Sequence, residues 1–165
     1  MTENLPFSKR PIDIFFSVMF SLFFITSMIS DMIPTLYGDL QANSSNIFMK
    51  MNYDYAIGCD PLFLHPPIWM RFVTGLSAFA YGPFYLILVY CLIKGYNRIQ
   101  VPAIIYGTAI VVITGVVVFG VEFWGEPEWR CQNPGKFLPF NSPYVLVPLL
   151  LIIRMRKELP FTRKF

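Results

Sequence analysis

The chain has 165 residues, of which 55% are hydrophobic and 14% are charged, and its formal net charge is +3. The mean hydropathy of +0.53 is too high for an ordinary soluble domain of this length. The sequence has no basic block long enough for binding nucleic acid. We therefore expect one membrane domain covering residues 1–165.

Four apolar segments are long enough to cross a membrane. They run from about residue 11 to 33, 68 to 93, 101 to 121 and 138 to 155. Each is close to the roughly 20 residues that span a hydrocarbon core of about 30 Å. Because backbone groups in lipid must pair within their own segment, each is predicted to be a helix. The expected fold is an all-α, multi-pass bundle of four transmembrane helices.

Basic residues gather in the segments that would share one side of the membrane. They precede the first span, join the second to the third, and follow the fourth: Lys9, Arg10, Lys94, Arg98, Arg154, Arg156, Lys157, Arg163 and Lys164. The positive-inside rule makes that side cytosolic, so both termini are predicted to be cytosolic. The two longer loops then face the lumen or the exterior.

These two longer loops carry residues that could form a disulfide or be glycosylated in an oxidising compartment. Cys59 lies in the first loop and Cys131 in the second, so they form either a disulfide or two free thiols. Asn43 begins the glycosylation sequon Asn-Ser-Ser. His65 is the only histidine and has no cysteine or histidine partner at metal spacing, so neither a metal nor a cofactor is expected.

The run "FFITSMISDMIP" places Asp31 near the end of the first span. A charged Asp near the bilayer centre costs about 2.5–3.5 kcal/mol. One interpretation puts Asp31 at headgroup level, since Pro34 follows soon. The other is an inward-facing acid that binds a cationic or hydroxylated ligand. Ser27, one turn earlier, and Phe24, about two turns earlier, would share its face.

The segment "CDPLFLHPPIWMRF" holds the second candidate acid, Asp60. An Asp before a proline in a turn often accepts hydrogen bonds from the next backbone amides. A structural capping role for Asp60 is therefore favoured over a catalytic one.

Polar residues and prolines also occur within the later spans. In "NSPYVLVP", Asn141 and Tyr144 are three residues apart and share a helix face, and Pro148 would bend the helix. The second span has Pro83 shortly after Tyr81. Kinked helices with these polar groups predict either a cavity with few polar groups or a packed bundle in which those groups bond one another.

The motifs "DPLFLHPPIWMRF", "VPAIIYG" and "SPYVLVPLLLI", together with the late acid of the first span, resemble the EXPERA-domain family of membrane proteins. Within this family, the motifs are most similar to the sigma-two receptor branch. The emopamil-binding sterol isomerases are related to that branch. The resemblance implies an occluded pocket for sterols and cationic amphiphiles, homodimerisation, residence in the endoplasmic reticulum, and a role in sterol homeostasis or lipid trafficking. It also implies ligand contacts for Asp31, Tyr106 and Tyr144, and a structural role for Asp60.

One departure from the family pattern affects function. The family has a glutamate in the second span where this chain has Ser77. Moving a proton on and off a sterol requires a positioned acid–base pair, so lipid binding without catalysis is favoured. Two alternatives remain: a sterol double-bond isomerase using Asp31, Asn141 and another donor, or a membrane scaffold for partner proteins.

Overall fold

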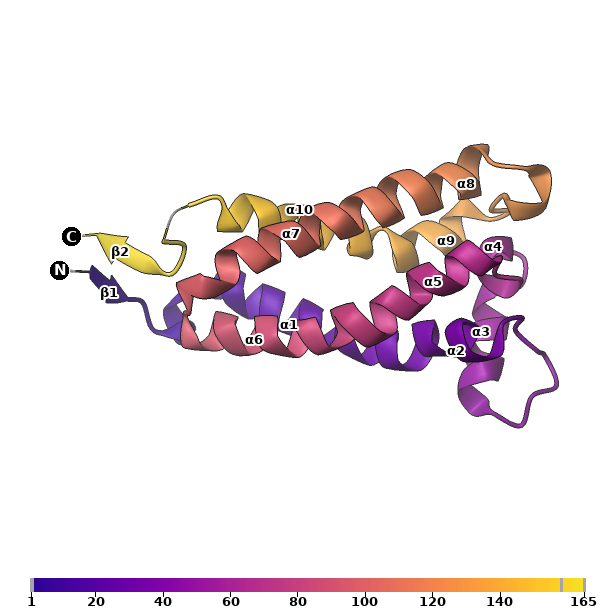
Figure 1. Cartoon of the computed structure of the whole chain (residues 1–165), viewed down its shortest axis with the longest axis horizontal. Helices are drawn as coiled ribbons and strands as arrows, with labels where there is room; N and C mark the ends of the chain where they lie inside the picture. The colour runs from indigo at the N-terminus through magenta and orange to yellow at the C-terminus, as the bar shows by residue number, and fades with distance from the viewer. Residues whose placement is uncertain (1, 158, 165) are drawn as a thin grey trace.

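The computed structural model describes residues 2–157 and 159–164 and shows an elongated bundle of four long helices (Figure 1). The four candidate membrane spans are Pro11–Tyr37, Ile68–Lys94, Asn97–Trp124 and Pro134–Met155. The predicted all-α four-helix membrane fold is confirmed, and each span extends a few residues beyond the apolar core of its sequence segment.

Three of the spans contain a π-helical segment between two α-helices. The first span consists of α1 (Pro11–Thr26), the π-helical segment Ser27–Asp31 and α2 (Met32–Tyr37). The second consists of α5 (Ile68–Leu76), the π-helical segment Ser77–Tyr81 and α6 (Gly82–Lys94). The third consists of α7 (Gln100–Ile110), the π-helical segment Val111–Val118 and α8 (Phe119–Trp124). Such segments widen a helix locally and often mark functional sites.

The fourth span and the connections complete the chain. The fourth span is formed by α9 (Pro134–Asn141) and α10 (Pro143–Met155), and Pro148 is buried inside α10. The first long loop folds into two helices, α3 (Ile47–Ala56) and α4 (Pro61–Leu64). Short 3-10 turns occupy Phe7–Lys9, Asn97–Ile99 and Pro127–Trp129.

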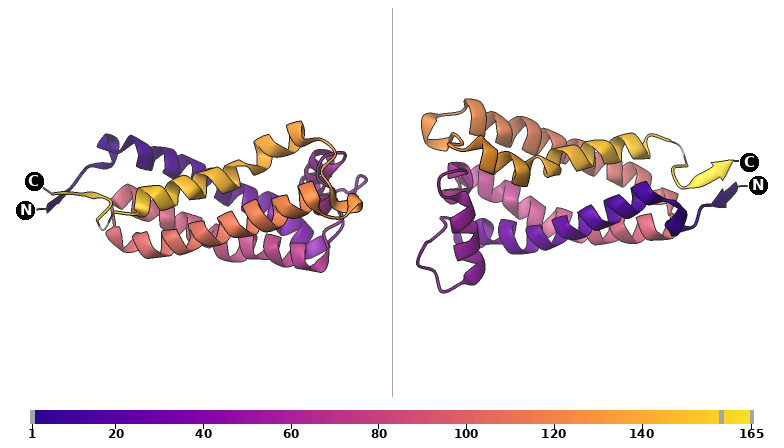
Figure 2. Two further views of the ribbon diagram at one scale, coloured as in Figure 1. Left: turned by 90° about the horizontal axis from the view of Figure 1, so that it is seen from above. Right: turned by 180° about the vertical axis from the view of Figure 1, so that it is seen from behind.

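The helices form two pairs, α1 with α6 and α7 with α10 (Figure 2). Gly107 lets the second pair approach closely, because a Cβ there would lie 2.8 Å from Ile152 and 3.2 Å from the Pro148 carbonyl oxygen. Aromatic rings fill the space between the pairs over the half of the bundle nearer the chain termini, where Phe20 lies 5.6 Å from Tyr85 and 5.9 Å from Tyr106 between ring centroids. This half of the bundle is therefore solidly packed.

The two termini lie together at one end of the bundle, called here the terminal end (Figure 1). There β1 (Thr2–Asn4) pairs antiparallel with β2 (Thr162–Lys164). Asp13, in the first turn of α1, is fully buried and paired with two arginines: Arg10 at 2.9 Å and Arg154 at 3.0 Å. Arg10 also donates to the carbonyls of Leu92 and Ile93 at the end of α6. The network thus ties three spans together.

Helices α3 and α4 cover the opposite end of the bundle, called here the cap end (Figure 1). Asn46 begins α3 by accepting hydrogen bonds from the backbone N–H groups of Phe48 and Met49. The inner face of α3 buries Met49, Asn52 and Ala56 against the bundle. The sequence interpretation treated this segment as a loop and missed the helix.

The cysteines and the sequon both lie at the cap end. Cys59 and Cys131 are free thiols in the structure, so the disulfide considered from the sequence is not formed in it. The Cys59 thiol donates to the Tyr55 carbonyl at 2.9 Å, and burial raises its pKa to about 11, which disfavours the reactive thiolate. Asn43 is exposed in the loop between α2 and α3, where glycosylation remains a prediction.

Candidate functional site

A cavity of about 470 Å³ lies between the two helix pairs at the cap end. Its size is within the range usual for small-molecule sites. All three π-helical segments contribute to its wall: Asp31 from the first span, Ser77 and Tyr81 from the second, and Thr114 from the third. The widened turns of three spans therefore line the same cavity. This cavity distinguishes the cap half of the bundle from the half that aromatic side chains fill.

Helix geometry places this cavity within the membrane. Asp31 is six residues from the end of α2 at Tyr37, and Asn141 is seven residues after the start of α9 at Pro134. At about 1.5 Å per residue, both lie about 9–11 Å from the cap end of their span. A hydrocarbon core is about 30 Å thick, so the cavity occupies the outer part of the bilayer nearest the cap.

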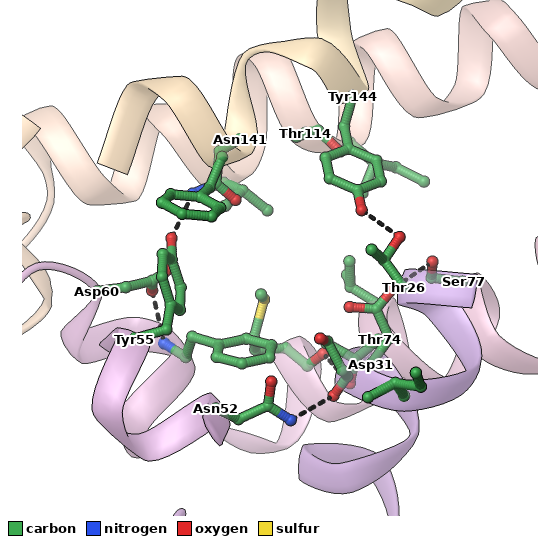
Figure 3. Close-up of a pocket in the computed structure, with 18 of the residues that line it drawn as sticks. Thr26, Asp31, Asn52, Tyr55, Asp60, Thr74, Ser77, Thr114, Asn141 and Tyr144 are labelled. Atoms are coloured by element: carbon green, nitrogen blue, oxygen red, sulfur yellow. Dashed lines mark hydrogen bonds between the residues drawn. The ribbon is translucent and has the colours of Figure 1, made fainter. Parts of the chain in front are cut away.

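One wall of the cavity carries Asp31, as the inward-facing interpretation predicted (Figure 3). The Ser77 hydroxyl donates to Asp31 Oδ2 at 2.6 Å, and the Ser27 and Ser77 hydroxyls lie 3.0 Å apart. Within the described part of the chain, no arginine, lysine or histidine forms an ion pair with Asp31. The polar side chains next to the Asp31 carboxyl are therefore hydroxyls, and Ser77 donates directly to it.

The predicted tyrosines occupy different positions relative to the cavity. Tyr81 and Tyr144 line it, and the Tyr144 hydroxyl forms a hydrogen bond with that of Thr26. Tyr106, expected to contact ligand, does not line this cavity, so its ligand contact stays a prediction that this geometry does not support. The third span enters from the terminal end, so Tyr106 is buried deeper, with its hydroxyl 3.2 Å from that of Tyr85.

The facing wall carries a second polar cluster, visible on the other side of Figure 3. The Tyr55 hydroxyl donates to Asp60 Oδ2 at 3.1 Å and accepts from Asn141 Nδ2 at 2.6 Å. Asp60 Oδ1 accepts from the Phe63 backbone N–H at 2.9 Å, so Asp60 caps α4 as expected. Asn141 lines the cavity and joins the fourth span to α3.

Burial controls the protonation of this second cluster. It raises the pKa of Asp60 above its ordinary value, although hydrogen bonds with Glu122, Phe63 and Tyr55 oppose the shift. It also raises the pKa of Tyr55 far above its ordinary value, and the nearby Asp60 charge adds to this effect. The Tyr55 hydroxyl consequently keeps its proton and remains a donor to Asp60.

Several lining residues were missed by the sequence interpretation. Tyr55 and Asn52 come from the unexpected helix α3, and Lys136 comes from α9. Asn52 Nδ2 donates to the Ser30 carbonyl oxygen at 3.3 Å. In a regular helix this carbonyl would accept from the N–H of residue 34, but that residue is Pro34, which has no N–H. The Asn46 cap followed by a ten-residue helical stretch was the available signal for α3.

Glu122 is a further acid beside this cluster. It is fully buried in α8, and its carboxyl group lies next to that of Asp60, close enough for the two side chains to interact. In the same described part of the chain, no group of three or more His, Cys, Asp or Glu residues could hold a metal ion. The site is therefore built from hydroxyls, amides, single carboxyls and one ammonium group.

Comparison with protein families identifies the domain. The family described as EXPERA (EXPanded EBP superfamily) matches residues 47–155, which is more than half of the chain. The chain belongs to the EXPERA family. This match supports a sterol-related membrane protein in general, and it begins at α3, after the span that carries Asp31. A comparison with curated proteins finds none that matches this EXPERA chain.

Proposed function

We propose that this EXPERA protein binds a sterol or a cationic amphiphile in the intramembrane cavity, with Asp31 as the polar anchor. The observation that carries the proposal is an acid facing a hollow of about 470 Å³ without a cationic partner among the described residues. An ionisable residue at membrane depth is expensive, so such residues usually serve a ligand or a pathway. A ligand amine or hydroxyl would supply the missing partner.

The surroundings of Asp31 favour an amphiphile over a small polar solute. Much of the remaining lining is apolar, including Ile29, Val73 and Ile110. A ligand that buries an apolar body gains about 25 cal/mol per Å² removed from water. The polar end would then meet Asp31 and the Ser77 hydroxyl, which points at that acid.

The biological setting follows from the motif resemblance and is part of the proposal. The sequence resembles the sigma-two receptor, which suggests residence in the endoplasmic reticulum, homodimer formation and a role in sterol homeostasis or lipid trafficking. The basic segments suggest that the terminal end faces the cytosol.

Binding is proposed without catalysis, because Ser77 offers a hydroxyl and not a second carboxylic acid beside Asp31. An isomerase would need a proton donor and an acceptor positioned on the same sterol. The decisive assay incubates the purified protein with an unsaturated sterol. Appearance of a shifted double bond would replace the binding proposal with an enzymatic function.

The binding proposal is tested by Asp31→Asn, measured with a tertiary-amine amphiphile and with a neutral hydroxysterol. Loss of a charged hydrogen bond, worth about 1.5–3 kcal/mol, should weaken amine binding about 10- to 100-fold. The hydroxysterol should lose much less, because an amide still accepts a hydrogen bond from a hydroxyl.

Asp39→Asn is the matched control. Asp39 follows the same span but is exposed, and its nearest basic partner is His65 at 3.6 Å. Its substitution should leave both affinities unchanged. Unaltered amine binding in Asp31→Asn would reject Asp31 as the anchor, as would equal losses in the two variants.

A further inference from the structure

Lys136 is an unpaired cation held in place at the edge of the cavity. Its ammonium donates to two backbone carbonyls of α3, at 3.0 Å to Asp54 and 2.7 Å to Tyr55. The same nitrogen lies 5.8 Å from the centroid of the Tyr55 ring, within cation–π range. These contacts fix the side chain, and because an ammonium has three N–H donors, one remains for another group.

Lys136 is the basic residue that lines the cavity, and its charge is not neutralised by an ion pair. Arg10, Arg154 and Lys50 form ion pairs with carboxylates, whereas Lys136, like Arg71 and Arg130, donates to backbone carbonyls and forms no ion pair among the described residues. Asp60, the acid that lines the same wall, already accepts hydrogen bonds from Phe63 and Tyr55 and is 5% exposed. A charge held by neutral carbonyls at the edge of a cavity still lacks a counter-ion.

The cavity therefore has two polar positions of opposite charge. Asp31 lies on the wall formed by the first two spans, and Lys136 lines the wall formed by α3 and α9. Apolar side chains separate them, including Ile113, Val118 and Met70. A ligand that matched both positions would have an apolar body, a donor group at one end and an acceptor group at the other.

We propose that Lys136 forms a second subsite that binds the carboxylate of an amphiphile whose other end carries a hydroxyl or amine at Asp31. A singly charged carboxylate fits better than a phosphate, because this wall offers one free ammonium donor. Both amide hydrogens of the neighbouring Asn141 are already donated, to Tyr55 and to the Phe137 carbonyl. The inference rests on the proposed function, since it assigns the second end of the same ligand.

The test compares two sterols that differ only at the end of the side chain. Both carry a 3-hydroxyl group; one side chain ends in a carboxylate and the other in a methyl group. Their affinities are measured for the full-length protein in lipid nanodiscs at pH 7.5, where the acid is ionised. The wild-type protein should prefer the sterol acid, and Lys136→Met should reduce that preference about 10- to 100-fold, the range expected for a charged hydrogen bond.

Two further variants separate a ligand contact from structural or long-range effects. Lys136→Arg retains the charge and should retain most of the preference. Lys50→Met removes a positive charge from α3, the helix that the Lys136 ammonium contacts, but Lys50 is exposed, pairs with Asp54 and does not line the cavity. It should leave the preference intact.

The outcomes also distinguish this inference from the function on which it rests. If Lys136→Met weakens both sterols equally, Lys136 only ties α9 to α3 and the subsite is rejected. An equal effect of Lys50→Met would assign the preference to surface charge and would also overturn it. Asp31→Asn should weaken both sterols only slightly and to the same degree, because an amide still accepts a hydrogen bond from the 3-hydroxyl, and it should preserve the preference. If Asp31→Asn leaves binding of the tertiary-amine amphiphile unchanged while Lys136→Met abolishes the preference, the subsite stands and the Asp31 anchor fails.

Discussion

Replacement of Asp60 by alanine should damage the fold more than ligand binding. The carboxylate caps α4 through the Phe63 N–H at 2.9 Å and accepts the Tyr55 hydroxyl at 3.1 Å. The variant loses both bonds and leaves a partly buried tyrosine hydroxyl without its acceptor. Asp60 also links α3 to α4, so the cap over the cavity depends on it.

The expected size of the effect comes from these two contacts. Loss of an N-cap costs about 0.5–2 kcal/mol. A buried donor left without a partner costs about 1–3 kcal/mol. Because Tyr55 retains the hydrogen bond from Asn141, we expect a combined loss of about 2–4 kcal/mol. For a chain of this length, this corresponds to a fall in Tm of roughly 4–16 °C.

Asp60→Asn separates the cap from the charge. Asparagine is as good an N-cap as aspartate, so this variant should retain most of the stability. Burial raises the pKa of Asp60, so the stability that it contributes is fully present below its unfolded pKa of about 3.9 and is lost as pH rises through the folded value. The Tm of the wild type relative to Asp60→Asn should therefore fall as pH increases above about 4.

The assay is thermal unfolding in detergent, followed by tryptophan fluorescence at each pH, with sterol affinity measured on the same preparations. Binding to Asp60→Ala below its Tm should remain within about threefold of the wild type. If Asp60→Ala unfolds like the wild type but loses binding more than tenfold, Asp60 is a ligand contact and the structural assignment is wrong. A pH-independent difference between the wild type and Asp60→Asn would contradict the role of burial.

Three other substitutions test the fold and the loops. Asp13→Asn breaks the buried pair with Arg154 and should destabilise the protein by about 3–5 kcal/mol in thermal unfolding, and an unchanged Tm would exclude this network as a tie between spans. Gly107→Leu places a side chain where a Cβ already lies 2.8 Å from Ile152; overpacking should cost about 1–3 kcal/mol, which denaturant unfolding can detect. Asn43→Gln should abolish a glycosidase-sensitive shift in gel mobility in mammalian cells; the absence of such a shift in the wild type would contradict glycosylation there.

The sequence was sufficient to predict the number of spans and the all-α membrane fold. Apolar runs of about 20 residues are long enough to cross the hydrocarbon core as helices. In lipid the backbone groups of such a run must bond within it, which leaves few alternatives to a helix. The cap at Asp60 was also predictable, because an Asp-Pro turn bonds its own neighbouring amides. The helix α3 was missed, since it is shorter than a span and the polar residues Lys50, Asn52 and Asp54 interrupt its apolar sequence.

The candidate site was only partly predictable. Asp31, Ser77, Tyr81, Asn141 and Tyr144 all line the cavity, in agreement with the placement that the sequence suggested. Helix periodicity indicates which residues share a face, but not which faces of different helices meet at the same depth. For the same reason, the sequence did not show that Tyr106 lies outside the cavity lining. Its depth relative to the cavity depends on how the four spans are shifted along one another.

The amino-acid sequence by itself determined that four helices cross a membrane with both chain ends on one side, because these properties depend on local hydropathy and on the number of spans. The tertiary structure decided that the bundle is hollow at the cap end, and that Asp31 and Lys136 line the same cavity from different walls. The hollow arises where π-helical segments of the first and second spans face the π-helical segment of the third span across the space between the two helix pairs. Such an arrangement depends on packing between residues far apart in the chain, which no local pattern of residues specifies.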